Sequence, residues 1–134
     1  PVNKYVAEFI GSPSMNFVEG QLENSNFEFD GLSFNLDGYS FKEKIKSNSK
    51  VWLGVRPENI IINEADKTMP VNCNVVVEVV EPMGADTLVW SSLNGKEIRF
   101  IVEGNKTINI GDKLSVGFDP AHISIFDFDT ENRL

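Results

Sequence analysis

The side chains with the greatest potential for chemistry in this 134-residue chain are few and far apart. His122 is its only histidine and Cys73 its only cysteine, so neither a two-histidine metal site nor an internal disulfide can form. Nucleophilic catalysis through His122 would need a positioned serine or cysteine and an orienting carboxylate beside it. The segment Pro120-Ala121-His122-Ile123 instead indicates the start of a strand. We expect structural roles for both residues, with Cys73 as a small buried side chain.

Two patterns approach ligand-binding motifs without completing them. Gly95-Lys96 is followed by Glu97, so the chain lacks the G-x-x-x-x-G-K-[ST] loop whose backbone amides cradle a phosphate. The acidic stretch 127–131 resembles the start of a calcium-binding loop, but Asn132 stands where that loop requires glycine. We expect a solvated acidic tail there. We also expect no catalytic, cofactor-binding or metal-binding residue in the chain.

The charge of the chain argues against a nucleic-acid partner. Its formal net charge is −8, whereas non-specific affinity for nucleic acid comes from basic side chains that neutralise phosphates. Trp52, Trp90 and ten phenylalanines could form a stacking surface for single strands. However, lysines and arginines do not alternate with these aromatic residues. We therefore expect core packing for the aromatic side chains.

One basic cluster is a candidate anion site. Lys42, Lys44, Lys46 and Lys50 lie close together in the sequence and are offset only in part by Glu43. Charge runs of this kind are most often solvated faces. Two interpretations stay open here: the solvated face of a short helix over residues 39–46, or a site for an anion.

The first half of the chain predicts one helix followed by strands. Apolar residues recur at helical spacing over residues 2–10, and Gly11 with Ser12-Pro13 ends that helix. The spacing then changes to period two, with strands expected near residues 15–22, 51–55 and 60–62. Asp30-Gly31 predicts a tight hairpin, because both positions of such a turn need positive φ.

Residues 71–127 carry the clearest strand pattern. Val75 to Val80 are apolar on both faces apart from Glu78, which predicts a centrally buried strand. Asn94-Gly95 predicts a hairpin between strands at 88–93 and 97–102. Five short strands separated by turn signals favour a small barrel or sandwich.

The length suits one domain, or one main β unit with a small addition, and no apolar run approaches the roughly 20 residues that span a bilayer. The start of the chain lacks the charged and apolar regions of a signal peptide. Because the first residue is Pro1, we expect a fragment of a longer polypeptide.

Four stretches, in order along the chain, carry more specific motifs. Residues 5–17 read YVAEFIGSPSMNF, Gly54–Ile60 read GVRPENI, residues 79–87 read VVEPMGADT, and Phe126-Asp127 is followed by Thr130. These stretches resemble the C-terminal part of the ATP-binding subunits of maltose-type and multiple-sugar ABC importers. In that family the corresponding motifs, in the same order, are "FVA-x-FIGSP-x-MNF", "G-[IV]-R-P-E-x-[IV]", "VE-x-LG-x-[ED]-T" and "FD-x-x-TG".

The chain departs from these motifs at three places. Pro82-Met83 replaces the usual residue-Leu pair, Asn59 stands where histidine is common, and Glu131 replaces the glycine after Thr130. None of these positions concerns catalysis, but each weakens any assignment of a transported sugar.

The resemblance implies a mainly β fold, an OB-like barrel of the transport-associated (TOBE, MOP-like) type with a short N-terminal linker helix and one short additional helix. Residues 1–13 would be the linker from a nucleotide-binding domain, and residues 14–134 the OB-like regulatory domain. The residues that the family motifs assign to structure or regulatory contact are Gly54, Arg56, Pro57, Glu58, Gly84, Asp86, Phe126 and Asp127. We expect Arg56-Pro57-Glu58 to form a chain turn and Gly84 to occupy a positive-φ position.

The implied function is that of a regulatory and dimerisation domain in the ATP-hydrolysing subunit of an importer for sugars, or for a related solute such as glycerol phosphate. ATP and Mg would bind the preceding domain, so this part would hold no cofactor and catalyse nothing. The implied partners are a second copy, the nucleotide-binding domain in cis, the permease subunits and a regulatory protein, at the cytoplasmic face of the membrane. A sensor domain for an oxyanion or a sugar is the alternative.

Overall fold

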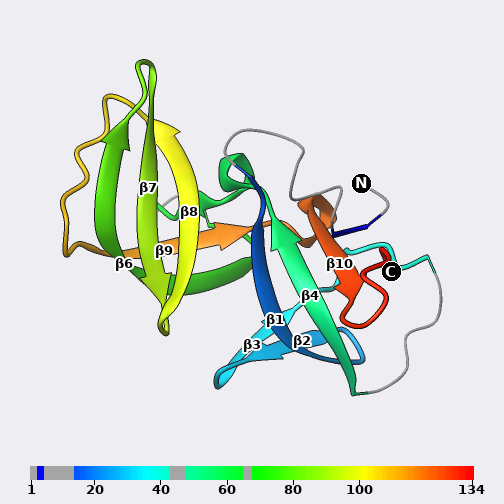
Figure 1. The fold of residues 1–134 in the computed structure, drawn as a ribbon. Coiled ribbons are helices and arrows are strands. Elements are labelled where there is room, and N and C mark those ends of the chain that lie inside the picture. The colour runs from blue at the N-terminus through cyan, green and yellow to red at the C-terminus, as the bar shows by residue number, and fades with distance from the viewer. Residues whose placement is uncertain (1–2, 5–13, 43–47, 65–67) are drawn as a thin grey trace. The chain divides into compact units, whose positions relative to one another are not determined.

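The computed structural model describes residues 3–4, 14–42, 48–64 and 68–134. It is mainly β, and its strands form two five-stranded sheets (Figure 1). Residues 1–56 and 119–134 form one compact unit, here unit 1, and residues 57–118 form a second, unit 2. Most of the predicted linker helix over residues 1–13 lies outside the described residues. The division into a linker and one domain over 14–134 stays a prediction.

Unit 1 contains an antiparallel sheet in the order β10-β4-β1-β2-β3. Its strands are β1 (Asn16–Glu23), β2 (Asn26–Phe29), β3 (Leu32–Asn35), β4 (Ser49–Val55) and β10 (Ile123–Asp127), and a 3-10 turn, η2 (Pro120–His122), precedes β10. Asp30 (φ 47°) and Gly31 (φ 82°) form the predicted hairpin turn between β2 and β3. The neighbouring strands β10 and β4 come from distant parts of the chain.

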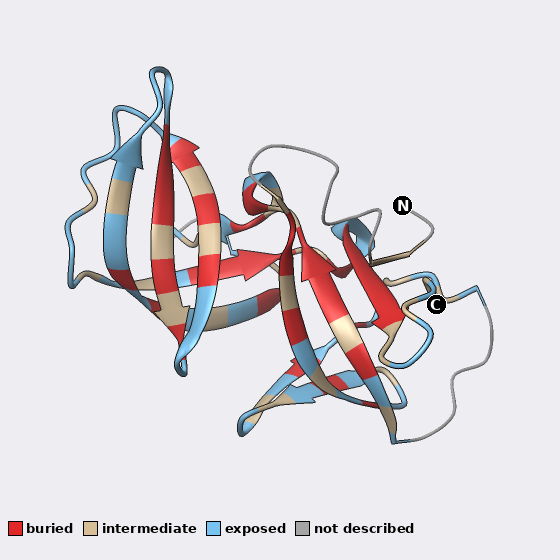
Figure 2. Ribbon diagram, viewed as in Figure 1, coloured by how far each residue is buried: buried red, intermediate tan, exposed pale blue. Residues whose placement is uncertain are grey.

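One face of this sheet forms the core of unit 1. Leu53 pairs with Val18 of β1 and with Ile125 of β10, and all three side chains are buried. Figure 2 shows buried and more exposed residues alternating along β1, as period-two spacing requires, whereas the last three residues of β4 are all buried. Phe27 and Phe34 stack from β2 and β3, with ring centroids 6.2 Å apart.

Unit 2 contains an antiparallel sheet in the order β5-β9-β6-β7-β8. It begins with the 3-10 turn η1 (Pro57–Asn59), followed by β5 (Ile61–Ile62), β6 (Val71–Pro82), β7 (Asp86–Leu93), β8 (Lys96–Glu103) and β9 (Lys113–Phe118). Asn94 (φ 49°) and Gly95 (φ 85°) form the predicted turn between β7 and β8. The edge strands β5 and β8 do not hydrogen-bond to each other, yet some of their Cα atoms lie within 8 Å. The sheet therefore curls almost to closure, which confirms the OB-like, barrel-type prediction.

The structure corrects two expectations about the second half of the chain. The last of the five predicted strands, β10, pairs with β4 in unit 1, and the fifth strand of unit 2 is the short β5. The Val75–Val80 segment is also not buried on both faces, since Val76 and Val79 are 41% and 49% exposed. A β-bulge between Val77 and Val79 shifts the register, and the outward-facing row carries Val79, Trp90 and Arg99.

The described residues hold little helix. Tyr39 to Lys42, the start of the predicted second helix, are irregular, and the segment 43–47 lies outside the described residues. The Tyr39 hydroxyl accepts a hydrogen bond from the Ile125 N–H (3.1 Å) and donates one to the Leu134 carbonyl (3.2 Å), which ties this segment to β10. No helix in the described part of the chain is long and apolar enough to cross a bilayer.

Candidate functional site

The residues singled out by the family motifs do not form one site. Gly54 and Phe126-Asp127 lie in unit 1, on neighbouring strands β4 and β10. Pro57 and Glu58 lie in η1, and Gly84 and Asp86 lie at the β6–β7 turn, both in unit 2. The motifs therefore mark several separate local structures in the two units.

Gly54 lies where three apolar side chains approach the β4 backbone. Met15, Phe17, Trp52 and Phe126 form an apolar cluster on the face of the unit 1 sheet opposite its core. A Cβ atom on Gly54 would lie 2.5 Å from the Met15 sulfur and 3.2 Å from ring atoms of Phe17 and Phe126. Such distances are too short for undisturbed packing. The glycine of the motif thus allows an aromatic layer to cover the sheet.

The segment Arg56-Pro57-Glu58 leads the chain from unit 1 into unit 2. Pro57 is buried at the first position of η1, where its fixed φ suits a helical turn. The Ile60 N–H donates to the Pro57 carbonyl at 3.4 Å, and η1 packs against β8. The Glu58 side chain is exposed. The buried proline shapes the turn, and Glu58 is available for an external contact.

The segment Gly84–Asp86 forms the turn between β6 and β7. Gly84 has φ of +90°, a conformation that L-residues other than glycine rarely adopt. The Met83 N–H donates to the Asp86 carbonyl, and the Gly104 N–H donates to the Ala85 carbonyl, both at 2.8 Å. These bonds use backbone atoms, so they shape the loop without engaging the Asp86 carboxylate.

Asp127 caps the C-terminal turn with its side chain. Its Oδ1 accepts hydrogen bonds from the backbone N–H groups of Thr130 (2.8 Å) and Asp129 (2.9 Å). These hydrogen bonds hold the pKa of the carboxyl below its usual value, and the bond from the Thr130 N–H contributes most. In the described residues no group of three His, Cys, Asp or Glu side chains is placed to hold a metal ion.

The tail after β10 is exposed at Asp129, Thr130 and Asn132, as expected, but it does not extend freely into solvent. The tail folds back on the strand, since the Leu134 N–H donates to the Ile125 carbonyl and Arg133 bridges to Phe126. Glu131, which replaces the family glycine, has φ of +60°. A residue with a Cβ atom is disfavoured in this left-handed region. The backbone at Glu131 therefore adopts a conformation that favours glycine.

Lys4 attaches the N-terminal part of unit 1 to this turn, a contact that the sequence did not indicate. Its N–H donates to the Glu131 carbonyl at 3.0 Å. Its ammonium lies 4.6 Å from the ring centroid of Phe17 and 4.5 Å from that of Trp52. Trp52 also stacks on Phe128, with ring centroids 5.3 Å apart. We call Lys4, Phe17, Trp52 and Glu131 the N-terminal clamp.

Of the basic cluster considered as an anion site, the structure describes Lys42 and Lys50. Lys44 and Lys46 lie outside the described residues. Lys50 pairs with Glu19 at 2.6 Å and lies 4.0 Å from the ring centroid of Phe128. Lys42 is exposed and lines a cavity of about 230 Å³ with Arg133 and Thr130, among others. Among the described residues, the candidate anion site consists of Lys42 and Arg133, with the Asp127 carboxylate beside them.

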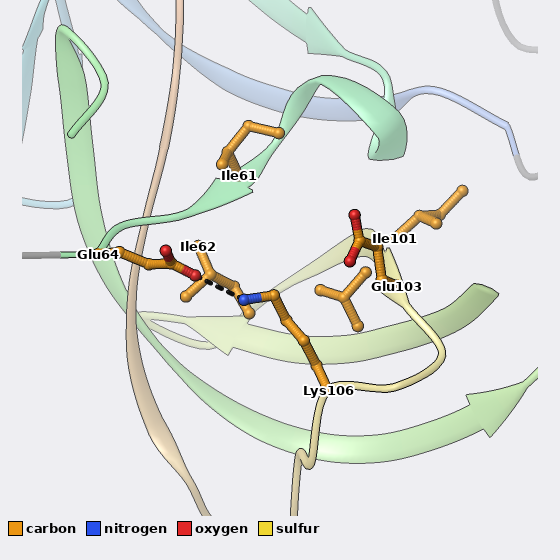
Figure 3. Close-up of a pocket in the computed structure, with 7 residues that line it drawn as sticks. Ile61, Ile62, Glu64, Ile101, Glu103 and Lys106 are labelled. Atoms are coloured by element: carbon orange, nitrogen blue, oxygen red, sulfur yellow. Dashed lines mark hydrogen bonds and ion pairs between the residues drawn. The ribbon is translucent and has the colours of Figure 1, made fainter. Parts of the chain in front are cut away.

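A larger cavity of about 420 Å³ lies in unit 2, between β5 and β8 (Figure 3). Isoleucine and valine side chains line it, together with Glu64, Glu103 and Lys106. Sequence reasoning missed this cavity, because its two walls belong to strands far apart in the chain.

The lone histidine and cysteine show no sign of catalysis. His122 is exposed at the end of η2. Cys73 is half-buried, and burial raises the pKa of its thiol to about 11. A thiol with so high a pKa is almost wholly protonated at neutral pH and is a poor nucleophile.

Comparison with known proteins identifies the family. Residues 53–126 match the family described as the TOBE domain, and residues 11–60 match the MalK OB fold domain. This chain belongs to the TOBE domain family. The resemblance to importer ATP-binding subunits is confirmed.

Curated relatives match along the entire chain. It is 31% identical to the xylose/arabinose import ATP-binding protein XacK of Haloferax volcanii and 33% identical to the sn-glycerol-3-phosphate import ATP-binding protein UgpC of Psychromonas ingrahamii. It is 29% identical to the oligosaccharides import ATP-binding protein MsmX of Bacillus subtilis. All of this TOBE chain is covered in each case, but only 36%, 36% and 38% of those relatives.

A solved structure shares the fold. The cytoplasmic molybdate-binding protein ModG superimposes with a TM-score of 0.60, covering 82% of this chain and 94% of that one. The two sequences are 13% identical. This likeness supports the OB-like architecture only.

Proposed function

We propose that this TOBE chain is a regulatory and dimerisation module of an importer's ATP-binding subunit, without catalysis of its own. The observation that carries the proposal is the match of the whole chain to about a third of XacK, UgpC and MsmX, all ATP-binding import proteins. The substrate class is a sugar or a related solute such as glycerol phosphate. ATP and Mg bind in the remainder of the subunit.

The geometry of the motif residues supports a role in shape and contact. Gly54 makes room for aromatic packing, Gly84 shapes a turn and the Asp127 carboxylate caps one. Glu58 is the exposed charged residue of the motif in η1. We propose that it contacts a partner: a second copy, the nucleotide-binding domain in cis, a permease subunit or a regulatory protein. The assembly lies at the cytoplasmic face of the membrane.

The test uses the full-length subunit with its permeases in proteoliposomes. Glu58→Ala should change transport-coupled ATP hydrolysis by at least about twofold, the lower end of typical coupling effects. The matched control is Glu97→Ala on β8, which removes an equally exposed charge outside the motifs. Equal ATPase rates for wild type and both variants would contradict the contact role of Glu58.

A second experiment addresses the domain role itself. The 134-residue chain should hydrolyse no ATP and should self-associate in sedimentation runs over a concentration series. Nucleotide turnover by this chain alone would overturn the proposal. A chain that stays monomeric at every concentration would count against dimerisation through this domain.

A sensor function is the second candidate, and the cavity of about 230 Å³ in unit 1 favours it. Lys42 and Arg133 supply two cationic side chains there, against one carboxylate, that of Asp127, and Thr130 supplies a hydroxyl. Calorimetry with molybdate, phosphate, sugar phosphates and neutral sugars tests it. A binding heat for one of the anions that disappears in the Arg133→Gln variant would support a sensor. No binding heat for any of the four ligand classes would exclude it.

A further inference from the structure

The cavity in unit 2 lies at the seam where its curled sheet fails to close. Ile61 and Ile62 belong to β5, and Ile101 to Glu103 belong to β8, the two edge strands of the sheet. The volume, about 420 Å³, lies within the range of small-molecule sites, roughly 300–1,000 Å³. An unclosed seam between edge strands leaves apolar side chains facing water: Ile61 is 37% exposed.

The polar groups of the cavity lie beside one another at its rim. Figure 3 shows the Lys106 side chain, from the loop after β8, reaching across to Glu64, which follows β5. Their N–O distance is 2.6 Å, and the side chains are 38% and 54% exposed. Ion pairs as exposed as this one contribute little to stability. The pair is therefore a weak latch across the seam that a ligand can displace.

The charges of the lining favour a cation. Two carboxylates, Glu64 and Glu103, accompany one ammonium, that of Lys106. Glu64 holds Lys106 in the latch, whereas the Glu103 carboxylate lies beyond ion-pair distance of the same ammonium and attracts it only at longer range. An apolar wall beside two carboxylates that share one ammonium complements a ligand with an aliphatic body and a cationic end.

We propose that this cavity binds a small aliphatic ammonium ion, such as a diamine. Its methylene groups lie against Ile61, Ile62 and Ile101, and one ammonium pairs with Glu103. A ligand bound there contacts both edge strands and so stabilises the nearly closed sheet. The inference depends on unit 2 alone and holds whether or not the chain has the role in import proposed above.

The probe is 1,6-diaminohexane, titrated into the 134-residue chain and followed by amide shifts in NMR spectra. The expected result is saturable shifts confined to β5, the end of β8 and Lys106, together with a higher midpoint of thermal unfolding. Hexane-1,6-diol has the same body without the charges and should bind much more weakly. Equal affinity for the diol, or no binding of the diamine, would overturn the proposal.

The matched variants separate a site from general attraction to an acidic protein. Glu103→Gln should weaken diamine binding about three- to fivefold, the value of one exposed ion pair. Glu97→Gln on the same strand changes the net charge equally and does not line the cavity, so it should bind as wild type does. Equal weakening in both variants, or shifts centred on the acidic residues 127–131, would refute the site.

Discussion

The two units use their charged side chains in different ways. In unit 1, the Lys4 ammonium lies over Trp52 and the Asp127 carboxylate accepts two backbone hydrogen bonds. In unit 2, the latch between Glu64 and Lys106 keeps both side chains largely exposed. Charges bound to fixed partners preserve a shape, whereas exposed charges exchange partners at little cost. Unit 1 also has an exposed ion pair, Lys50 with Glu19, so the contrast concerns the Lys4 and Asp127 contacts and not every charge of that unit.

Each unit carries its own fluorescent reporter, which makes this comparison measurable. Trp52 lies on β4 of unit 1, and Trp90 lies on β7 of unit 2. A Trp90→Phe background therefore reports on unit 1 alone, and a Trp52→Phe background reports on unit 2. Urea unfolding in both backgrounds assigns each change in stability to one unit.

The largest effect is expected for Gly54→Val. The new side chain must displace Met15 and the rings of Phe17 and Phe126, and such overpacking costs about 2–3 kcal/mol. The loss should appear in the Trp52 signal. Gly54→Ala is the graded control and should lose less, because the sulfur nearest to its Cβ ends a flexible side chain. A valine variant as stable as wild type would refute the packing role of this glycine.

Asp127→Ala removes the cap of the C-terminal turn and should cost about 1–2 kcal/mol, as lost caps do. The stability from this carboxylate also depends on pH. Because its pKa is lower in the folded state than the ordinary value of 3.8, the stabilisation is present above pH 3.8 and is lost as pH falls through the folded pKa.

The pH test compares wild type with Asp127→Asn by urea unfolding at pH 6 and pH 3. The difference in stability between the two proteins should shrink at the lower pH. A difference independent of pH would show that the hydrogen bonds act without the charge.

Glu131→Gly should stabilise unit 1 by about 1 kcal/mol. Glycine has no Cβ atom to clash at φ of +60°. The free energy gained by removing this strain exceeds the entropic cost of ordering a glycine on folding. Glu131→Ala keeps the strain and should gain nothing, which separates backbone conformation from loss of the carboxylate. Loss of stability in the glycine variant would contradict this explanation.

Lys4→Met should cost about 0.5–1 kcal/mol, the usual value of an exposed cation–π contact. It keeps the apolar stem but removes the charge over Phe17 and Trp52. The Trp52 emission should shift, whereas Lys4→Arg, which keeps a cation, should leave it near the wild-type position. Identical spectra for all three proteins would exclude the N-terminal clamp in solution.

The smallest effect is expected at the latch of unit 2. Lys106→Gln breaks the pair with Glu64, whose groups are both exposed, so unfolding followed by Trp90 should not change measurably. A clear loss would show that the latch is structural and would weaken the contrast between the two units.

Local features of the fold were predictable from sequence. Asp30-Gly31 and Asn94-Gly95 form their turns because adjacent residues alone determine whether two positive φ angles are tolerated. The strand around Val75 was predicted correctly in type but wrongly in burial. Periodicity shows which residues share a face. It does not show whether another layer covers that face.

The candidate sites were less predictable. The motifs located Gly54 and Asp127, but their roles became evident only from Met15 and Phe17 above the glycine and from the N–H groups around the carboxylate. The contact of Lys4 with Trp52 joins residues 48 positions apart (52 − 4). No short-range pattern encodes such a contact.

By itself, the sequence determined the strand-rich composition, the tight turns, the acidic charge and the family. Only the tertiary structure decided that β10 pairs with β4, that β5 completes the other sheet and that its two edges leave a cavity. Turn geometry depends on the conformations open to one or two residues. Strand partners and cavities depend on free-energy differences among many long-range pairings, and these emerge only when the whole chain packs.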